Sequence, residues 1–214
     1  MKSKIFILAM LFPISLVFLC SHGIAGEPTE MVKRMLDQVI SIQTDPQIQA
    51  HEFRNKRRIA IKKIVANSFD FDMMSEKVLE DFRPKLNDTQ WAEFKAVFRD
   101  LFIDSYTRLV LDFLKQEEVR YIEEGIDQSG ALVKTAIIRI NDEISVDYLL
   151  TSAEKVSLIY DVKIDGVSIV KNYRKSFSRV IKHKSYETLL KKMHIQQQII
   201  EKDSDKAGIS IFQL

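Results

Sequence analysis

The sequence contains a single cysteine, Cys20, which directly follows an apolar run close to the N-terminus. If the segment that contains both is removed as a leader, the remaining chain can form neither a disulfide bond nor a thiol nucleophile, so its core must hold the fold alone. Glycine is also scarce, with six residues in 214. So few glycines leave little material for phosphate-binding loops, and neither a P-loop nor a dinucleotide-binding fingerprint is present.

Residues that carry chemistry are equally sparse. No histidine has metal-ligand spacing to another histidine or to the cysteine, and the segment 166–170 (GVSIV) lacks the second glycine of a nucleophile elbow. Lysine and arginine together number 32 against 30 for aspartate and glutamate, and this balance gives no general attraction to nucleic acid. We therefore predict no catalytic residue, no metal, no cofactor and no nucleic-acid partner. The scattered histidines are His22, His51, His183 and His194.

The N-terminus has the features of a secretory signal peptide. Two lysines precede the apolar run Ile5–Leu19, and Gly23-Ile24-Ala25 forms a small-x-small cleavage site. A membrane anchor is the first alternative, but the run is short for a hydrocarbon layer of about 30 Å. A lipoprotein anchor is the second, but bulky residues precede Cys20. We predict a signal peptide at 1–25, a single domain at 26–200 and a flexible tail at 201–214.

The first half of the domain has helical periodicity, because apolar residues recur at three- and four-residue spacing. The longest segment begins at Asn87, which forms a capping-box pattern with Gln90, and runs to about Lys115. Its apolar side is wide and rich in phenylalanine, as expected for a helix that packs over a sheet. Another predicted helix begins near Pro28-Thr29 and ends before Pro46, and the remaining ones are 53–66, 73–82, 169–182 and 185–200.

The second half alternates apolar and polar residues, which predicts strands at 118–123, 131–140, 145–151 and 154–164. Their short connections predict an antiparallel meander. The predicted fold class is α+β. In it, N-terminal helices and a long helix pack over a curved antiparallel sheet of about four strands, and C-terminal helices close a structure that encloses an apolar cavity.

The chain is organised around the stretch 156–177, where the last predicted strand gives way to a helix. Asp165-Gly166 is a turn signal, and apolar residues then recur at helical spacing. The strand alternation places Asp161 and Asp165 on one polar face. We predict that both carboxylates are solvated there, with a buried carboxylate pair as the alternative.

Three blocks of sequence resemble the MlaC family. Segment 160–177 (YDVKIDGVSIVKNYRKSF) resembles the family pattern Y-D-V-x-I-E-G-V-S-L-V-x-N-Y-R-x-x-F. Segment 69–79 (FDFDMMSEKVL) resembles F-D-F-x-x-M-S-x-x-V-L, and segment 91–109 resembles the long aromatic helix of the family. Members, also known as toluene-tolerance auxiliary proteins, are periplasmic phospholipid carriers of Gram-negative bacteria.

The resemblance implies a function that needs no covalent chemistry. Phospholipid tails are expected inside the fold, with the headgroup near the surface, and the lipid is cargo rather than a cofactor. The implied partners are an inner-membrane ABC transporter complex with a membrane-anchored substrate-binding subunit, and an outer-membrane lipoprotein complex. A monomeric carrier would shuttle lipid between them and so maintain outer-membrane lipid asymmetry.

A cavity for two acyl chains is energetically reasonable. The chains expose several hundred Å², so roughly ten kcal/mol of transfer free energy is available at about 25 cal/mol per Å², before binding costs. We predict that Arg174 meets the phosphate, because a guanidinium offers paired donors. For Arg174 the alternatives are an ordinary solvated charge and a docking surface for acidic transporter subunits, and for the wall residues below the alternative is a dense core. The predicted wall residues are Phe94, Phe98, Phe102, Tyr106, Tyr160, Val162, Ile164, Val167, Tyr173 and Phe177.

Two other classes of protein remain open. An enzyme on a cone-shaped α+β fold, acting on a lipid-like or sterol-like substrate, would need a carboxylate or histidine inside the pocket. The alternation places Asp147, like Asp161 and Asp165, opposite the apolar faces, which leaves Arg139 as the best polar candidate. A structural periplasmic adaptor with a closed core is the third class.

Overall fold

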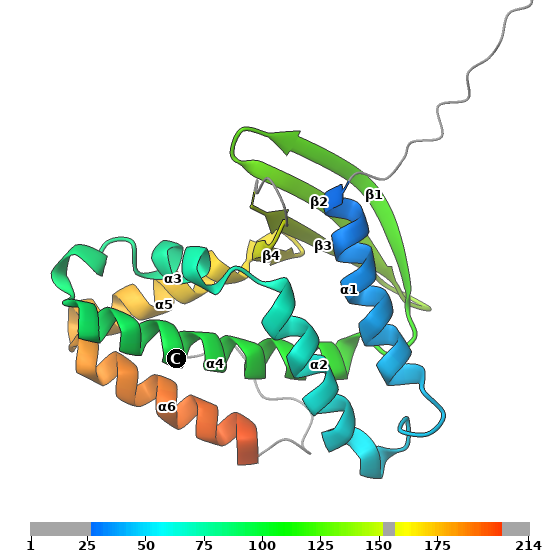
Figure 1. The fold of residues 1–214 in the computed structure, drawn as a ribbon, viewed down its shortest axis with the longest axis horizontal. Coiled ribbons are helices and arrows are strands. Elements are labelled where there is room, and N and C mark those ends of the chain that lie inside the picture. Colours follow the sequence, from blue (N-terminus) through cyan, green and yellow to red (C-terminus); the bar gives the residue numbers. More distant parts are fainter. Residues whose placement is uncertain (1–26, 152–156, 203–214) are drawn as a thin grey trace, which may run out of the picture.

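The computed structural model describes residues 27–151 and 157–202 (Figure 1). The predicted signal peptide lies outside these residues, as do most of the predicted tail and the start of the last predicted strand. No helix in the described ranges is both long and apolar enough to cross a membrane. The helices are α1 (Glu27–Thr44), α2 (Arg54–Ser68), α3 (Phe71–Leu79), α4 (Asp88–Phe113), α5 (Ile169–His183) and α6 (Tyr186–Lys202), with short 3-10 turns at His51–Phe53 and Arg83–Lys85.

The sheet is an antiparallel meander in the order β1-β2-β3-β4-β5, which confirms the predicted α+β class. The fifth strand was not predicted. It exists because Asp165 and Gly166 both adopt positive φ, of 48° and 77°, the conformation that lets a two-residue turn close a hairpin. The strands are β1 (Glu118–Asp127), β2 (Gly130–Ile138), β3 (Glu143–Leu150), β4 (Ile159–Ile164) and β5 (Val167–Ser168).

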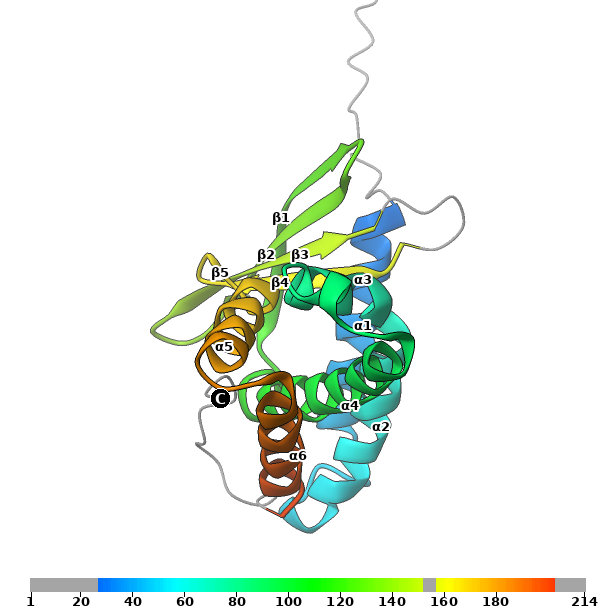
Figure 2. The ribbon, with the colours of Figure 1, turned by 90° about the vertical axis from the view of Figure 1, so that its left-hand side faces the viewer.

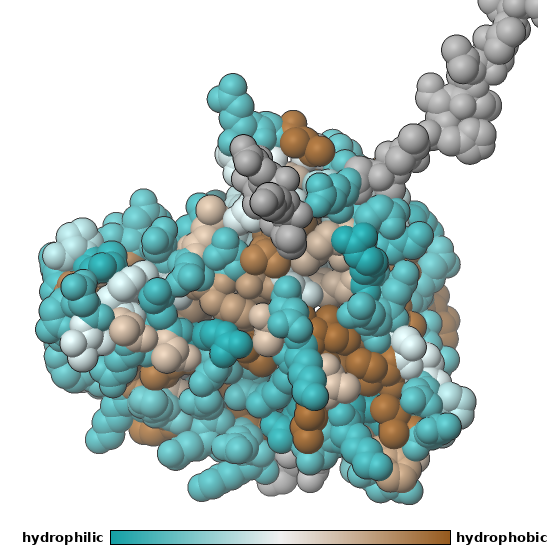
Figure 3. Space-filling view, in the orientation of Figure 1, coloured by the Kyte–Doolittle hydropathy of each residue, from teal (hydrophilic) through white to brown (hydrophobic). Residues whose placement is uncertain are grey.

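The helices surround α4, which runs through the middle of the helical part of the molecule (Figures 1 and 2). Helices α2, α3 and α6 all pack against it, while α1 lies along β1 and β2 and α5 packs on α3 and β4. On the face drawn in Figure 3, hydrophilic side chains dominate, as expected for the outer sides of such helices. The sheet and α4 therefore form two layers, with other helices closing the sides.

Side-chain caps fix where three helices begin. The capping box predicted at Asn87 and Gln90 is present at the start of α4. Asp70 accepts a hydrogen bond from the amide of Met73 and begins α3, and Ser168 does the same for Lys171 at the start of α5. Each cap satisfies an amide that the first helical turn leaves unpaired.

The prediction that Asp161 is solvated is wrong. Its side chain is buried, and its two oxygens accept hydrogen bonds from the Ser168 hydroxyl, at 2.5 Å, and from the Val170 amide, at 3.1 Å. The reason is that β5 and the start of α5 return over this face of β4. Burial raises the pKa of Asp161 above its usual range. Asp165 is exposed, and it accepts a hydrogen bond from the Ser145 amide.

Candidate functional site

An apolar pocket of about 360 Å³ lies between the C-terminal half of α4 and the sheet. Helix α1 contributes one residue to its wall, and the start of α5 contributes two. The lining is almost entirely aliphatic or aromatic. Its members are Leu36, Tyr106, Leu109, Val110, Phe113, Leu114, Ile137, Ile144, Val146, Tyr148, Val162, Ile164, Asp165, Val167, Ile169 and Asn172.

Two sequence periods bring these side chains together. On α4, Tyr106, Leu109, Val110 and Phe113 recur at the three- and four-residue spacing that places them on one helical face. On β3, residues 144, 146 and 148 alternate and therefore point to one side of the sheet. Because α4 packs over that side, its apolar face and the strand residues become opposite walls of the pocket.

The wall of the pocket carries a neutral polar pair. The hydroxyls of Tyr106 and Tyr148 form a hydrogen bond to each other. Burial raises the pKa of Tyr106 to about 12 and that of Tyr148 well above its usual range. Both phenols are therefore uncharged at neutral pH, and the interior of the pocket presents no charge from this pair.

The exposed members of the lining mark the mouth of the pocket. Phe113 at the end of α4 is 46% exposed, and Val167 on β5 is 63% exposed. Asp165 lies beside them in the turn before β5, and half-buried Asn172 lies on α5. The mouth thus combines apolar side chains with a few polar groups, while the wall behind it is apolar.

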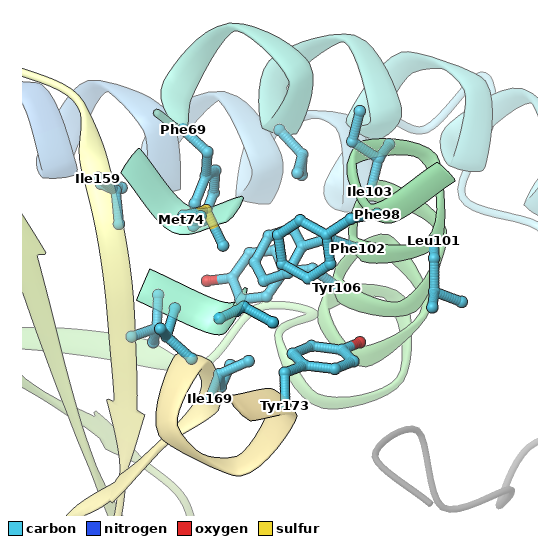
Figure 4. Packing of buried hydrophobic residues seen from close by; sticks show 14 of the residues in the cluster. Phe69, Met74, Phe98, Leu101, Phe102, Ile103, Tyr106, Ile159, Ile169 and Tyr173 are labelled. Carbon is cyan, nitrogen blue, oxygen red and sulfur yellow. The ribbon is translucent and has the colours of Figure 1, made fainter. Parts of the chain in front are cut away.

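Four of the predicted wall residues line this pocket: Tyr106, Val162, Ile164 and Val167. The other predicted aromatic residues of α4 and α5 belong to the buried core, and Phe98, Phe102 and Tyr173 are seen packed together in Figure 4. The ring centroid of Phe98 lies 5.5 Å from that of Tyr173 and 6.2 Å from that of Phe177, which is the spacing of directly packed rings. These aromatic core residues are Phe94, Phe98, Phe102, Tyr173 and Phe177.

Tyr160 departs from the predicted alternation because β4 contains a bulge. Leu149 pairs with Asp161 and Leu150 with Ile159, so Tyr160 is an extra residue between two pairs. Its half-buried ring packs under the ammonium group of Lys77, 4.8 Å from the ring centroid. The bulge therefore separates Tyr160 from Val162 and Ile164, which reach the pocket.

Arg174 is held at the end of α3, and it does not line the pocket. Its guanidinium forms ion pairs with Glu80, at 2.5 Å, and with Asp81, at 3.0 Å. These contacts tie α5 to α3, and the arginine side chain remains 38% exposed. Contact between Arg174 and a lipid phosphate stays a prediction.

Sequence reasoning missed most of the sheet side of the pocket. Ile137, Ile144, Val146 and Tyr148 lie on alternating positions of β2 and β3, so strand periodicity could have identified them. The predicted wall residues lie instead on the aromatic helix and in the blocks of family resemblance. The lining residues of α1 and of the C-terminal turn of α4 lie on helical faces that the sequence shows to be apolar. Which of them line a pocket depends on how the helices pack.

Among the described residues, the lining of the pocket contains no histidine and no buried carboxylate. Its one carboxylate, Asp165, accepts the amide of Ser145. Arg139, the polar candidate for an enzyme, donates to the carbonyl of Phe113 at 2.7 Å and so caps the end of α4. Within residues 27–151 and 157–202, no group of three or more potential ligands could hold a metal ion.

The chain belongs to the MlaC family. A family model described as "MlaC protein" matches residues 33–194, which confirms the resemblance seen in the sequence. Among solved structures, a phospholipid-binding protein from Ralstonia solanacearum in complex with a phospholipid is similar, with a TM-score of 0.68 and 18% identity. The match covers 82% of this chain and 99% of that one, and at this identity it establishes the fold. No curated protein sequence matches the chain.

Proposed function

We propose that this protein is a periplasmic phospholipid carrier that holds acyl tails in the pocket between α4 and the sheet. The observation that carries the proposal is the wall of the pocket, which is apolar and lies behind a mouth where Phe113 and Val167 are exposed. Tails gain about 25 cal/mol for each Å² that leaves water, and the apolar wall imposes no desolvation cost on its own side, because the one carboxylate of the lining, Asp165, is exposed at the mouth. A volume near 360 Å³ falls within the range of about 300–1,000 Å³ typical of small-molecule sites.

Family membership and the structural neighbour support the same reading. The neighbour of this fold was solved with a phospholipid, and the family matches most of this chain. In this proposal the protein is a monomeric binding protein and not an enzyme, and the lipid is its cargo. It would exchange lipid with an inner-membrane ABC transporter complex and an outer-membrane lipoprotein complex, and so contribute to outer-membrane lipid asymmetry.

The mouth of the pocket indicates how a headgroup would be held. A lipid whose tails lie between α4 and β3 leaves its phosphate near Asn172 and the exposed Val167. Asn172 can donate from its side-chain amide to a phosphate oxygen. Arg174 lies further along α5, and reaching the phosphate would require it to leave Glu80 and Asp81.

The test is to fill the pocket. Leu109 lines it and is half-buried, so Leu109→Trp should occupy tail volume at little cost to the fold. Leu149 is also half-buried but points to the other side of β3, so Leu149→Trp is the matched control. Purified exported protein would be extracted with organic solvent, and the phospholipid would be quantified by mass spectrometry. We expect lipid from the wild type and the control, and at least a several-fold loss from Leu109→Trp.

Two results would contradict the proposal. Wild-type protein that carries no phospholipid, and takes up none from added lipid, has no cargo of this class. Equal lipid content in the wild type and in a folded Leu109→Trp protein would place the lipid elsewhere in the molecule.

A further inference from the structure

Helix α5 carries a straight row of cations on its outer side. Lys171, Lys175, Arg179 and Lys182 are all exposed. At 100° per residue they fall within an arc of roughly 80°, and at 1.5 Å per residue they extend over about 16 Å. The helix contains no aspartate or glutamate between Ile169 and His183. These four residues are called the α5 stripe below.

The direction of the α5 stripe is fixed by the packing of the opposite face. Ile169, Tyr173 and Phe177 are buried in the core on that side. The helix is also tied at its start by the Ser168 cap and the hydrogen bond from Val170 to Asp161. Because the buried face cannot rotate outward without breaking these contacts, the stripe always faces away from the core.

Helix α2 provides an internal comparison, because it too has several basic residues and no acidic one. Its cations are largely engaged by the protein. Arg54 pairs with Asp112 at 2.6 Å, Lys62 pairs with Asp104, and Arg57 is buried and donates to the carbonyl of Ala50. In the described ranges no member of the α5 stripe forms an ion pair. The two helices lie on different sides of the molecule (Figure 2).

The α5 stripe begins beside the pocket mouth. Lys171 is next to Asn172, which lines the pocket, and four residues after the exposed Val167. The whole chain is almost neutral, with 32 basic and 30 acidic residues. The positive charge of the α5 stripe is therefore a local feature of the surface, and the stripe extends along α5 from the mouth of the pocket.

We propose that the α5 stripe docks the mouth of the pocket against the surface of a bilayer containing anionic phospholipid. Four or more basic residues on one amphipathic helix favour binding to anionic lipid surfaces. A row about 16 Å long can contact several headgroups at once, and the exposed Val167 at its end is available to the interface. Binding of the α5 stripe to a bilayer does not depend on the proposed carrier function. Only the purpose of that binding, to present the mouth of the pocket to lipid, rests on the proposed function.

The experiment measures vesicle binding by co-sedimentation of the purified exported protein. Vesicles are a two-to-one mixture of phosphatidylcholine and phosphatidylglycerol, or phosphatidylcholine alone. The test variant is K175E/R179E/K182E, and the charge-matched control is K56E/R58E/K63E on α2. Each changes the net charge by the same amount, and all six residues lie at least partly exposed. A neutral variant, K175Q/R179Q/K182Q, serves if the reversed stripe does not fold.

We expect the wild type and the α2 control to bind the anionic vesicles and not the neutral ones. The α5 variant should bind roughly a hundredfold more weakly, about fivefold for each basic residue near an anionic surface. Raising the salt concentration should reduce wild-type binding, because such contacts are screened. Lipid content, measured separately by extraction, should stay as in the wild type, so loss of docking and loss of cargo are distinguishable.

Three outcomes would overturn the proposal. Wild-type protein that binds both kinds of vesicle equally, or neither, has no anionic-surface preference. Equal weakening by the α2 and α5 variants would show an effect of overall charge. Finally, if the wild type ignores vesicles but the α5 variant alone loses lipid delivery to a partner complex, the stripe contacts an acidic protein surface instead.

Discussion

The two halves of α4 have similar apolar side chains, but one half packs into a filled core and the other forms a wall of the pocket. In the N-terminal half, the rings of Phe94 and Phe98 stack with their centroids 5.7 Å apart. Both rings pack edge-on against Phe177 of α5, at centroid distances of 6.1 and 6.2 Å, and together they form a filled aromatic core. In the C-terminal half, Leu109 and Phe113 face the sheet across the pocket. The same helical period thus produces a solid core in one half and a pocket in the other.

The difference comes from what lies opposite each half. Helix α5 brings further aromatic rings, which fill the space beside the first half. The sheet brings shorter side chains, among them Val146 and Val162, to the second half. Since interiors are otherwise close-packed, the pocket marks the place where shorter sheet residues meet the helix. Whether an aromatic helix forms a filled core or the wall of a pocket therefore depends on the element that packs against it.

The largest expected effect is on the filled half. Phe98→Ala should lower the free energy of unfolding by about 3–5 kcal/mol, because the side chain is fully buried and its loss leaves a cavity. Leu109→Ala should cost clearly less, because Leu109 already borders open volume. Urea denaturation of both variants measures this difference. Similar losses at the two positions would show that the halves are packed alike.

A smaller effect is expected where the aromatic core borders the pocket, at the pair of tyrosines, because Tyr106 stacks on Phe102 and also lines the pocket. Tyr106→Phe leaves the Tyr148 hydroxyl without its partner, which should lower stability by about 1–3 kcal/mol. The double variant Y106F/Y148F removes both hydroxyls, so it should be less destabilised than the sum of the single variants. A double-mutant cycle by urea denaturation measures the coupling. Strict additivity would mean that the two hydroxyls do not interact.

The same pair gives a dependence on alkaline pH. The pKa of Tyr106 is raised to about 12 in the folded protein, against 10.0 ordinarily. The unfolded chain therefore loses this proton first, and the free energy of unfolding should fall as pH rises from about 10 to about 12. The wild type should lose more stability over this range than Y106F/Y148F. Parallel curves for the two proteins would contradict the raised pKa.

Whether a feature of the fold or the site could be predicted depends on how far apart in the sequence the interacting residues lie. The capping box at Asn87 and the alternation on β2 and β3 depend on neighbouring residues, and both are evident in the sequence. The burial of Asp161 is different, because it is created when β5 and α5 return over β4. Likewise the bulge at Tyr160 depends on pairing with β3, which strict period-2 counting cannot detect. The pocket itself depends on which residues oppose α4.

The smallest expected effect concerns Arg174, which lies on α5 between the aromatic core and the solvent. Its pairs with Glu80 and Asp81 are partly exposed, and such pairs contribute at most about 1 kcal/mol. Arg174→Ala should therefore lower the free energy of unfolding by no more than that, and the loss should shrink at high salt. Urea denaturation at two salt concentrations measures it.

A second background separates the structural role of Arg174 from contact with a lipid phosphate. In E80Q/D81N the carboxylates that hold the guanidinium are gone, so Arg174→Ala should no longer affect stability if the ion pairs were its whole role. Lipid content then becomes the deciding measurement. If Arg174 contacts a phosphate, Arg174→Ala lowers retained phospholipid in both backgrounds, and freeing the arginine in E80Q/D81N raises retention because its paired donors can turn to the phosphate. Unchanged lipid content in all four proteins would assign Arg174 to joining α5 with α3, and would leave Asn172 as the polar side chain on α5 at the mouth.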